Sequence, residues 1–111
     1  VRLPRAEITL QLSEIVYIAA NDHVTEVGTV SGQVYKSNML FKDFAATLTE
    51  ECFMECNRGI IINMDHAASI RDGSVIMQDG KAFPIRQRDK KAITSRFTRY
   101  AAAKVRRKLD I

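Results

Sequence analysis

The last quarter of the chain carries a dense group of basic residues, whose chemistry is the binding of anions. Nine of the seventeen basic residues lie between Arg88 and Lys108, against one acid, Asp89. The first 87 residues are mildly acidic, with eight basic and eleven acidic side chains. This asymmetry predicts a polyanionic partner, of which nucleic acid is the most common. The alternative interpretation is that the charges form the solvated face of a helix.

The thiols and imidazoles do not form a recognisable catalytic or metal site. Cys52 and Cys56 are the two cysteines, and their spacing favours small, semi-buried side chains over a disulfide framework. His23 and His66 are too isolated from them in the sequence to predict a zinc site. No Ser-His-Asp or Cys-His order and no glycine-rich phosphate loop stands out. We therefore expect a binding protein without enzymatic activity, metal or cofactor.

Short β-strands must position these residues over the first three-quarters of the chain. The strands are predicted at 7–12, 15–20, 24–30, 33–36, 53–55, 60–62, 67–70, 75–77 and 82–85. The turns between them are expected at Asn21-Asp22, Ser31-Gly32, Asp72-Gly73 and Asp79-Gly80. Asp-Gly is favoured where a hairpin requires positive φ. Such closely spaced strands predict a mainly antiparallel β fold.

Two segments have helical spacing instead. The first runs from Asn38 to Leu48, with Asn38 as a candidate N-cap. The second begins near Asp89, which suits the positive end of a helix dipole, and ends in basic residues that suit the negative end. Its apolar stripe consists of Ile93, Phe97, Tyr100, Ala101 and Val105. A C-terminal helix thus explains part of the basic cluster, though not all of it.

A chain of 111 residues without repeats or linkers is expected to be a single domain, residues 1–111. The apolar blocks, such as Gly59–Ile62, are short, and none approaches the roughly 20 residues that a membrane span needs. The polar start, Val1–Glu7, does not resemble a signal peptide, so we expect a cytoplasmic location. Because the chain starts without Met, we expect a domain excised from a longer regulator, which a sensor segment outside this sequence could tether to a membrane.

Four stretches occur in the order and spacing of a known family. They are residues 15–24 (IVYIAANDHV), Gly32-Gln33-Val34-Tyr35 leading into the helix at Leu40, residues 53–63 (FMECNRGIIIN) and residues 79–88 (DGKAFPIRQR). Together they resemble the LytTR domain, the DNA-binding module of many bacterial response regulators, from about Glu7 to Tyr100. The resemblance implies an elongated, mostly β fold whose inter-strand loops enter successive major grooves of bent duplex DNA. Residues 101–111 are a basic helical extension that the family pattern does not explain.

The resemblance also implies which residues contact DNA. The family's three base-contacting positions match His23, Arg58 and Arg88, with Arg86 in place of Arg88 if the alignment shifts. An arginine can span O6 and N7 of guanine, and a neutral histidine can donate to or accept from a base edge. The residues expected to contact phosphates or to support the site are Lys36, Asn57, Arg86, Gln87, Lys90 and Lys91.

Simpler roles are open for the same residues. His23 can be only a turn residue, Arg58 can pair with Glu55, and Arg88 can be solvated in the first turn of the helix. Asn63 is expected to cap the turn that follows it rather than to contact DNA.

This chain departs from the family pattern at two of the matched steps. The family usually has His-Arg-Ser where this chain has Asn57-Arg58-Gly59, and Ser-Arg-Arg where it has Arg86-Gln87-Arg88. These departures predict a different target sequence. Cys56 is two residues from Arg58, so we also hypothesise that oxidation or alkylation blocks binding if its thiol faces the DNA.

The sequence therefore predicts sequence-specific double-stranded DNA binding by the effector domain of a bacterial two-component transcription regulator. A missing N-terminal receiver would bring two copies to repeated sites, since one small domain reads few base pairs. The isolated domain is expected to be monomeric. The alternative is a non-catalytic interaction module that pairs with another regulator, or that binds RNA or an anionic surface through its basic tail.

Overall fold

The structure is a computed structural model that describes residues 2–3 and 8–109, with side chains from residue 9 onward. The strands are β1 (Arg2–Leu3), β2 (Ile8–Thr9), β3 (Ile15–Asn21), β4 (Val24–Thr29), β5 (Val34–Ser37), β6 (Phe53–Asn57), β7 (Ile60–Asn63), β8 (Ala67–Arg71), β9 (Ser74–Met77) and β10 (Ala82–Pro84). The helices are α1 (Phe41–Thr47) and α2 (Lys90–Leu109), with 3-10 turns η1 (Leu12–Glu14), η2 (Met64–His66) and η3 (Gln87–Asp89).

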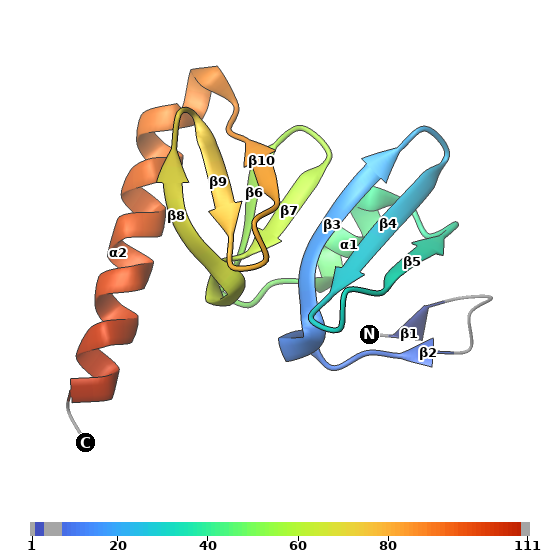
Figure 1. The fold of residues 1–111 in the computed structure, drawn as a ribbon. Coiled ribbons are helices and arrows are strands. Elements are labelled where there is room, and N and C mark those ends of the chain that lie inside the picture. The colour runs from blue at the N-terminus through green and yellow to red at the C-terminus, as the bar shows by residue number, and fades with distance from the viewer. Residues whose placement is uncertain (1, 4–7, 110–111) are drawn as a thin grey trace.

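The strands form antiparallel sheets (Figure 1). A five-stranded sheet has the order β5-β4-β3-β7-β6, a three-stranded sheet has the order β10-β9-β8, and β1 pairs with β2. The long helix α2 lies beside the three-stranded sheet, and its C-terminal half runs on past the ends of the strands. The mainly antiparallel β fold with a C-terminal helix, predicted from the sequence, is confirmed.

The five-stranded sheet separates two hydrophobic clusters because alternate side chains of a strand point to opposite faces. On β7, Ile61 belongs to the cluster that contains Phe44 of α1, whereas Ile62 belongs to the cluster that contains Val75 of β9 and Ile93 of α2. The sheet is therefore covered by α1 on one face and by the three-stranded sheet with α2 on the other.

Tyr17 of β3 connects the two sheets. Its ring lies against Gly28 of β4, where any Cβ would overlap it, and packs on Phe83 of β10 with centroids 4.9 Å apart. The ammonium of Lys81 lies 5.0 Å from the centre of the same ring. Glycine at position 28 thus gives Tyr17 the space to reach across.

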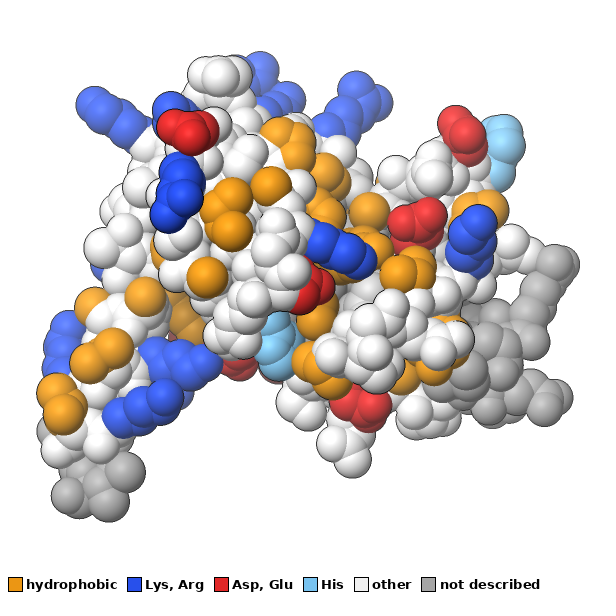
Figure 2. All heavy atoms as spheres, viewed as in Figure 1, with side chains coloured by type: hydrophobic (Ala, Val, Ile, Leu, Met, Phe, Trp, Pro, Cys, Tyr) orange, Lys and Arg blue, Asp and Glu red, His pale blue; other side chains and the backbone are white. Residues whose placement is uncertain are grey.

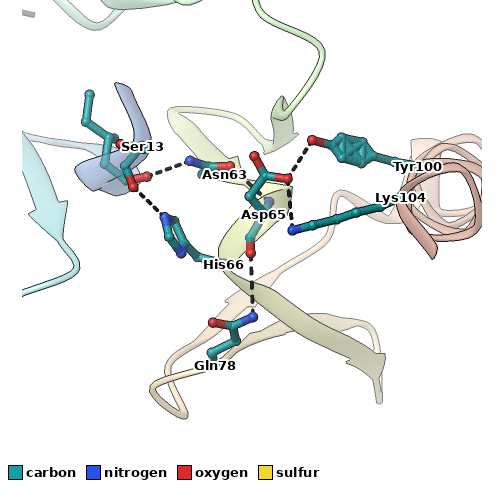
Figure 3. Close-up of polar contacts among 8 residues, drawn as sticks. Ser13, Asn63, Asp65, His66, Gln78, Tyr100 and Lys104 are labelled. Atoms are coloured by element: carbon teal, nitrogen blue, oxygen red, sulfur yellow. Dashed lines mark hydrogen bonds and ion pairs between the residues drawn. The ribbon is translucent and has the colours of Figure 1, made fainter. Parts of the chain in front are cut away.

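The turn η2 joins the N-terminal part of the chain to α2 (Figure 3). Asn63 accepts a hydrogen bond from the backbone N–H of Asp65 at 2.9 Å and donates one to the carbonyl of Ile15 at 2.8 Å. The predicted cap by Asn63 is confirmed. The Asp65 carboxylate accepts a 2.6 Å hydrogen bond from Tyr100 and lies 3.2 Å from the Lys104 ammonium, so it holds α2 in place.

Two predictions about the elements are wrong. The strand expected over residues 7–12 ends at Thr9 within the described residues, because Leu12 begins η1; Glu7 lies outside them. Asn38 is not the N-cap of the first helix. The Thr25 hydroxyl donates to the carbonyl of Met39, and the Ser37 hydroxyl accepts a hydrogen bond from the N–H of Met39. These bonds hold the chain extended up to Leu40, which is the N-cap of α1 and makes no side-chain capping bond.

Candidate nucleic-acid interface

His23 lies in a tight turn between β3 and β4. Asn21 pairs with Val24, so Asp22 and His23 form the connection, one residue later than the turn predicted from the sequence. Asp22 adopts a φ of 56°, which Asp and Asn tolerate better than other side chains with a Cβ. The His23 side chain is exposed at the tip.

Arg58 occupies the corresponding position between β6 and β7. Asn57 pairs with Ile60, which leaves Arg58 and Gly59 as the turn, and the Arg58 side chain is exposed. Gly59 has a φ of 73°, and a Cβ there would lie 3.2 Å from the Cβ of Ala20. A side chain with a Cβ would be strained at this φ, so glycine suits the turn.

The Asn57 side chain fixes the Arg58 turn to a second segment far along the chain. Its amide nitrogen donates to the carbonyl of Pro84 at 3.1 Å, and its amide oxygen accepts from the N–H of Arg58 at 2.7 Å. Alongside, the N–H of Arg86 donates to the carbonyl of Cys56 at 2.8 Å. Asn57 therefore sets the relative positions of Arg58 and the segment that leads to Arg88.

Backbone hydrogen bonds bring two more turns, β3–β4 and β8–β9, to the same end of the molecule. The N–H of Ala20, at the end of β3, donates to the carbonyl of Gly59 at 2.8 Å. The N–H of Ile85 donates to the carbonyl of Gly73, in the turn between β8 and β9, at 2.9 Å. We call this end the turn edge: residues 22–23, 58–59, 71–73 and 84–91. In Figure 1 these connections lie along one side, opposite the free end of α2.

The turn edge is cationic. Its exposed basic residues are Arg58, Arg71, Arg86, Arg88, Lys90 and Lys91. Figure 2 shows Lys and Arg side chains spread along this side, with a histidine at one end. Arg86 lies 3.9 Å from the carboxylate of Asp89, which partly offsets its charge. Within the described part of the chain, Arg58 makes no ion pair with Glu55.

Arg71 is a residue at this edge to which the sequence did not direct attention. It ends β8 and precedes the Asp72-Gly73 turn, in which both residues have positive φ, 52° and 76°. The sequence signal that could have identified Arg71 is a basic residue next to a predicted hairpin turn, as at Arg58. Its proximity to the other turns depends on the bond between Ile85 and Gly73, which no local pattern predicts.

Lys36 and Gln87 were expected to support DNA binding and have different surroundings. Lys36 is exposed on β5 and pairs in register with Glu26 of β4, so an acidic neighbour offsets part of its charge. Gln87 begins η3 and is exposed beside Arg86 and Arg88.

The hypothesis of a reactive thiol facing DNA is wrong for Cys56. The side chain is fully buried in the cluster with Met54, and burial raises its pKa to about 11. A protonated, inaccessible thiol reacts slowly with oxidants and alkylating agents. Cys52 is half-buried at the other end of β6, and burial, followed by the charge of Asp65, raises its pKa as well.

The described residues contain neither a grouped set of metal ligands nor a membrane-spanning helix. No three His, Cys, Asp or Glu side chains there are grouped so that they can hold a metal ion. Among the helices, none has the length and apolar character to cross a membrane.

A second cationic region lies on α2 beyond the turn edge. We call residues 99–109 the distal helix. Its basic residues are Arg99, Lys104, Arg106, Arg107 and Lys108, and the sequence of α2 contains no acid. Only Lys104 forms an ion pair among the described residues, with Asp65. The two cationic regions thus differ in support: hydrogen bonds fix the first, whereas most of the second projects into solvent.

Comparison with known proteins gives a consistent result. The sequence profile of the LytTr DNA-binding domain family matches residues 6–98. Among solved structures, the chain is similar to the LytTr DNA-binding domain of a protein from Bacillus cereus described as a methyl-accepting/DNA response regulator. The TM-score is 0.70 at 21% sequence identity, over 80% of this chain and 85% of that chain, which establishes a shared fold. No curated protein sequence matches this chain.

Proposed function

Since this chain belongs to the LytTr DNA-binding domain family, whose members act in response regulators, we propose that its turn edge reads the sequence of double-stranded DNA. The turns carrying His23 and Arg58, together with the segment carrying Arg88, enter neighbouring major grooves. In this proposal the domain acts in transcription regulation by binding DNA, and the turn edge catalyses no reaction.

The observation that carries this proposal is the pair of hydrogen bonds made by the Asn57 side chain, to Pro84 and to Arg58, which we call the Asn57 bracket. It ties Arg58 to the Pro84–Arg86 segment from 27 residues away, so that two arginine-bearing elements share one rigid edge. An arginine can donate two parallel hydrogen bonds to O6 and N7 of guanine, a contact that discriminates by about 1–3 kcal/mol. That geometry requires a fixed backbone, which the bracket supplies.

The other residues of the edge have a supporting part in this proposal. Lys90 and Lys91 open α2 beside the turns and are exposed, so they contact phosphates. Arg71, Arg86, Gln87 and, from β5, Lys36 position the duplex in the same way. His23 reads a base edge when neutral and favours phosphate when protonated.

The proposal extends to the longer protein. An upstream receiver or sensor domain regulates pairing, and two copies bind repeated half-sites, because each mismatch costs only about 1–3 kcal/mol and one domain reads few base pairs. The protein acts in the cytoplasm, where the DNA is.

Selection from a random duplex library at physiological salt, followed by sequencing of the bound pool, tests this function. We expect an enriched motif, and an Arg58→Gln variant should lose enrichment at one position of it. An Arg107→Gln variant, with the same charge change on the distal helix, is the matched control and should recover the wild-type motif. Bound but unenriched DNA would contradict sequence reading.

A further inference from the structure

The distance from the turn edge grows along the distal helix, from about 12 Å at Arg99, eight residues after Lys91, to the end of α2. Arg107 follows Lys90, the first residue of α2, by 17 positions, which corresponds to about 25 Å along the helix axis at 1.5 Å per residue. At physiological salt the screening length is about 8 Å. Duplex DNA on the turn edge therefore gains little from the charges of the distal helix, and these charges are available to a different partner.

A pocket of about 320 Å³ opens where this helix meets the body of the domain. It is lined by the apolar side chains of Met64, Tyr100 and Ala103 and by the arginines Arg96, Arg99 and Arg107. Glu51 also lines it and is its one acidic residue. The pocket is open to solvent and combines apolar contact area with three guanidinium groups.

The arrangement along α2 leaves room for a ligand. Arg99, Ala103 and Arg107 are four residues apart, so they lie in one row on the helix surface. The small Ala103 leaves a hollow between the two arginines. The guanidinium of Arg96 donates to the carbonyl of Phe53 at 3.0 Å, which holds it against the body. Arg99 and Arg107 face the hollow with no ion-pair partner among the described residues.

Charge and apolar exposure indicate the chemistry of the partner. The sequence of α2 has eight basic residues and no acid, so a second copy of this helix would be repelled. Beside its arginines, the pocket is lined by the apolar side chains of Met64, Tyr100 and Ala103. A nucleic-acid backbone supplies anions without apolar side chains, whereas an acidic amphipathic protein segment supplies both.

We propose that the pocket bounded by Arg99, Ala103 and Arg107 binds an acidic segment of a partner protein that also carries apolar side chains. Carboxylates of the segment pair with Arg99 and Arg107, and one apolar side chain enters the hollow at Ala103. Arginine suits this task because its planar fork binds carboxylates through two hydrogen bonds. The domain then binds DNA at one end and a protein at the other.

Fluorescence anisotropy of the full chain with a labelled peptide tests this proposal. The probe is a peptide of about four Glu-Leu-Glu-Ala repeats at physiological salt, a composition suited to an amphipathic acidic helix. A double Arg99→Gln, Arg107→Gln variant should bind it at least about tenfold more weakly, because both carboxylate contacts are lost. Ala103→Phe, which fills the hollow and leaves every charge in place, should weaken binding by a similar factor.

Matched variants separate the pocket from general effects. Ala102→Phe adds the same ring to a neighbouring exposed position, and Arg58→Gln removes a charge from the turn edge; both should leave peptide affinity unchanged, with helix content checked by circular dichroism. Equal binding of a polyglutamate of the same length, insensitive to Ala103→Phe, would overturn the proposal in favour of charge alone. Displacement of the peptide by random duplex DNA, with both ligands weakened by the double arginine variant, would assign the surface to nucleic acid instead.

Discussion

The turn edge and the distal helix carry similar charge but hold it in different ways. At the turn edge, the arginines lie at the ends of strands or in the segment after Pro84, and hydrogen bonds such as Asn57 to Pro84 and Ala20 to Gly59 set the positions of these elements. On the distal helix, the side-chain hydrogen bonds to the body among the described residues are those from Tyr100 and Lys104 to Asp65. Positioned charges can read a pattern of donors and acceptors, whereas loosely held charges mainly attract.

This difference shows that the density of basic residues in a sequence does not identify the surface proposed to read DNA bases. The densest basic run, Arg106-Arg107-Lys108, is the part of the chain farthest along α2 from the turns. Arg58 stands almost alone in an acidic stretch of sequence, yet hydrogen bonds in the fold join its turn to the segment that contains Pro84 and Arg86.

The largest effect that should separate the two regions is the loss of Arg58. Arg58→Ala is expected to cost about 1–3 kcal/mol on the selected site and little on random duplex, because a base contact carries sequence information. Titration by fluorescence anisotropy on both duplexes measures the difference. Arg106→Ala serves as the comparison and should change neither value by much; equal losses on both duplexes for Arg58→Ala would show a phosphate contact.

Removal of the bracket should have the next largest effect. Asn57→Ala leaves the N–H of Arg58 and the carbonyl of Pro84 without their partner, and we expect a loss of about 1 kcal/mol of affinity for the selected site. Calorimetric titration of the variant with that site gives the value. Arg58→Ala and Asn57→Ala should not be additive in the double variant, since both act through the same contact; strict additivity would separate their roles.

Salt dependence should distinguish phosphate contacts at the edge from charges on the distal helix. Lys91→Ala is expected to weaken all duplexes alike and to lower the slope of log affinity against log salt by about one. Arg107→Ala should leave that slope unchanged. A reduction of the same size in both variants would mean that the distal helix lies on the DNA.

The smallest expected effect concerns the attachment of α2. Burial favours the neutral form of Asp65, but hydrogen bonds from Tyr100 and Lys104 outweigh it and lower the pKa of Asp65. A lowered folded pKa stabilises the fold above the unfolded value of about 3.9, and this contribution disappears as the pH falls through the folded pKa.

The Tyr100→Phe variant isolates this contribution. It should reduce the free energy of unfolding by about 0.5 kcal/mol near pH 7, a modest amount because the Asp65 side chain is 39% exposed. The variant and the wild type should converge in stability in strong acid, as followed by urea denaturation across pH. If the difference in stability between the variant and the wild type were the same at all pH values, ionised Asp65 would be excluded as the hydrogen-bond partner of Tyr100. The affinity of the variant for DNA should equal that of the wild type.

Local patterns in the sequence were enough to predict the elements at the turn edge, but not their contacts. The Asp72-Gly73 turn follows from the positive φ that such hairpins need, and the paired strands follow from alternation. The bonds from Asn57 to Pro84 and from Ile85 to Gly73 join segments that are distant or separated by turns. Arg71 was missed for that reason.

The wrong predictions for Cys56 and Asn38 have local causes, and the sequence contained part of the information needed to avoid them. Cys56 shares a strand face with the buried Met54, so alternation already placed its thiol in the core. Asn38 has the residue type of an N-cap, but tertiary bonds from Thr25 and Ser37 at Met39 delay the helix to Phe41. The apolar stripe of α2 is continuous in the sequence, but Ile93, Phe97 and Tyr100 pack against the core whereas Val105 is exposed.

Chemical-shift mapping of the amide spectrum, during titration with the duplex recovered by selection, tests the division of roles most directly. We predict that the amides of His23, Arg58 and Arg88 shift strongly, while those of residues 101–109 stay in place. Strong shifts centred on residues 101–109, with the turns unchanged, would contradict the assignment of DNA reading to the turn edge.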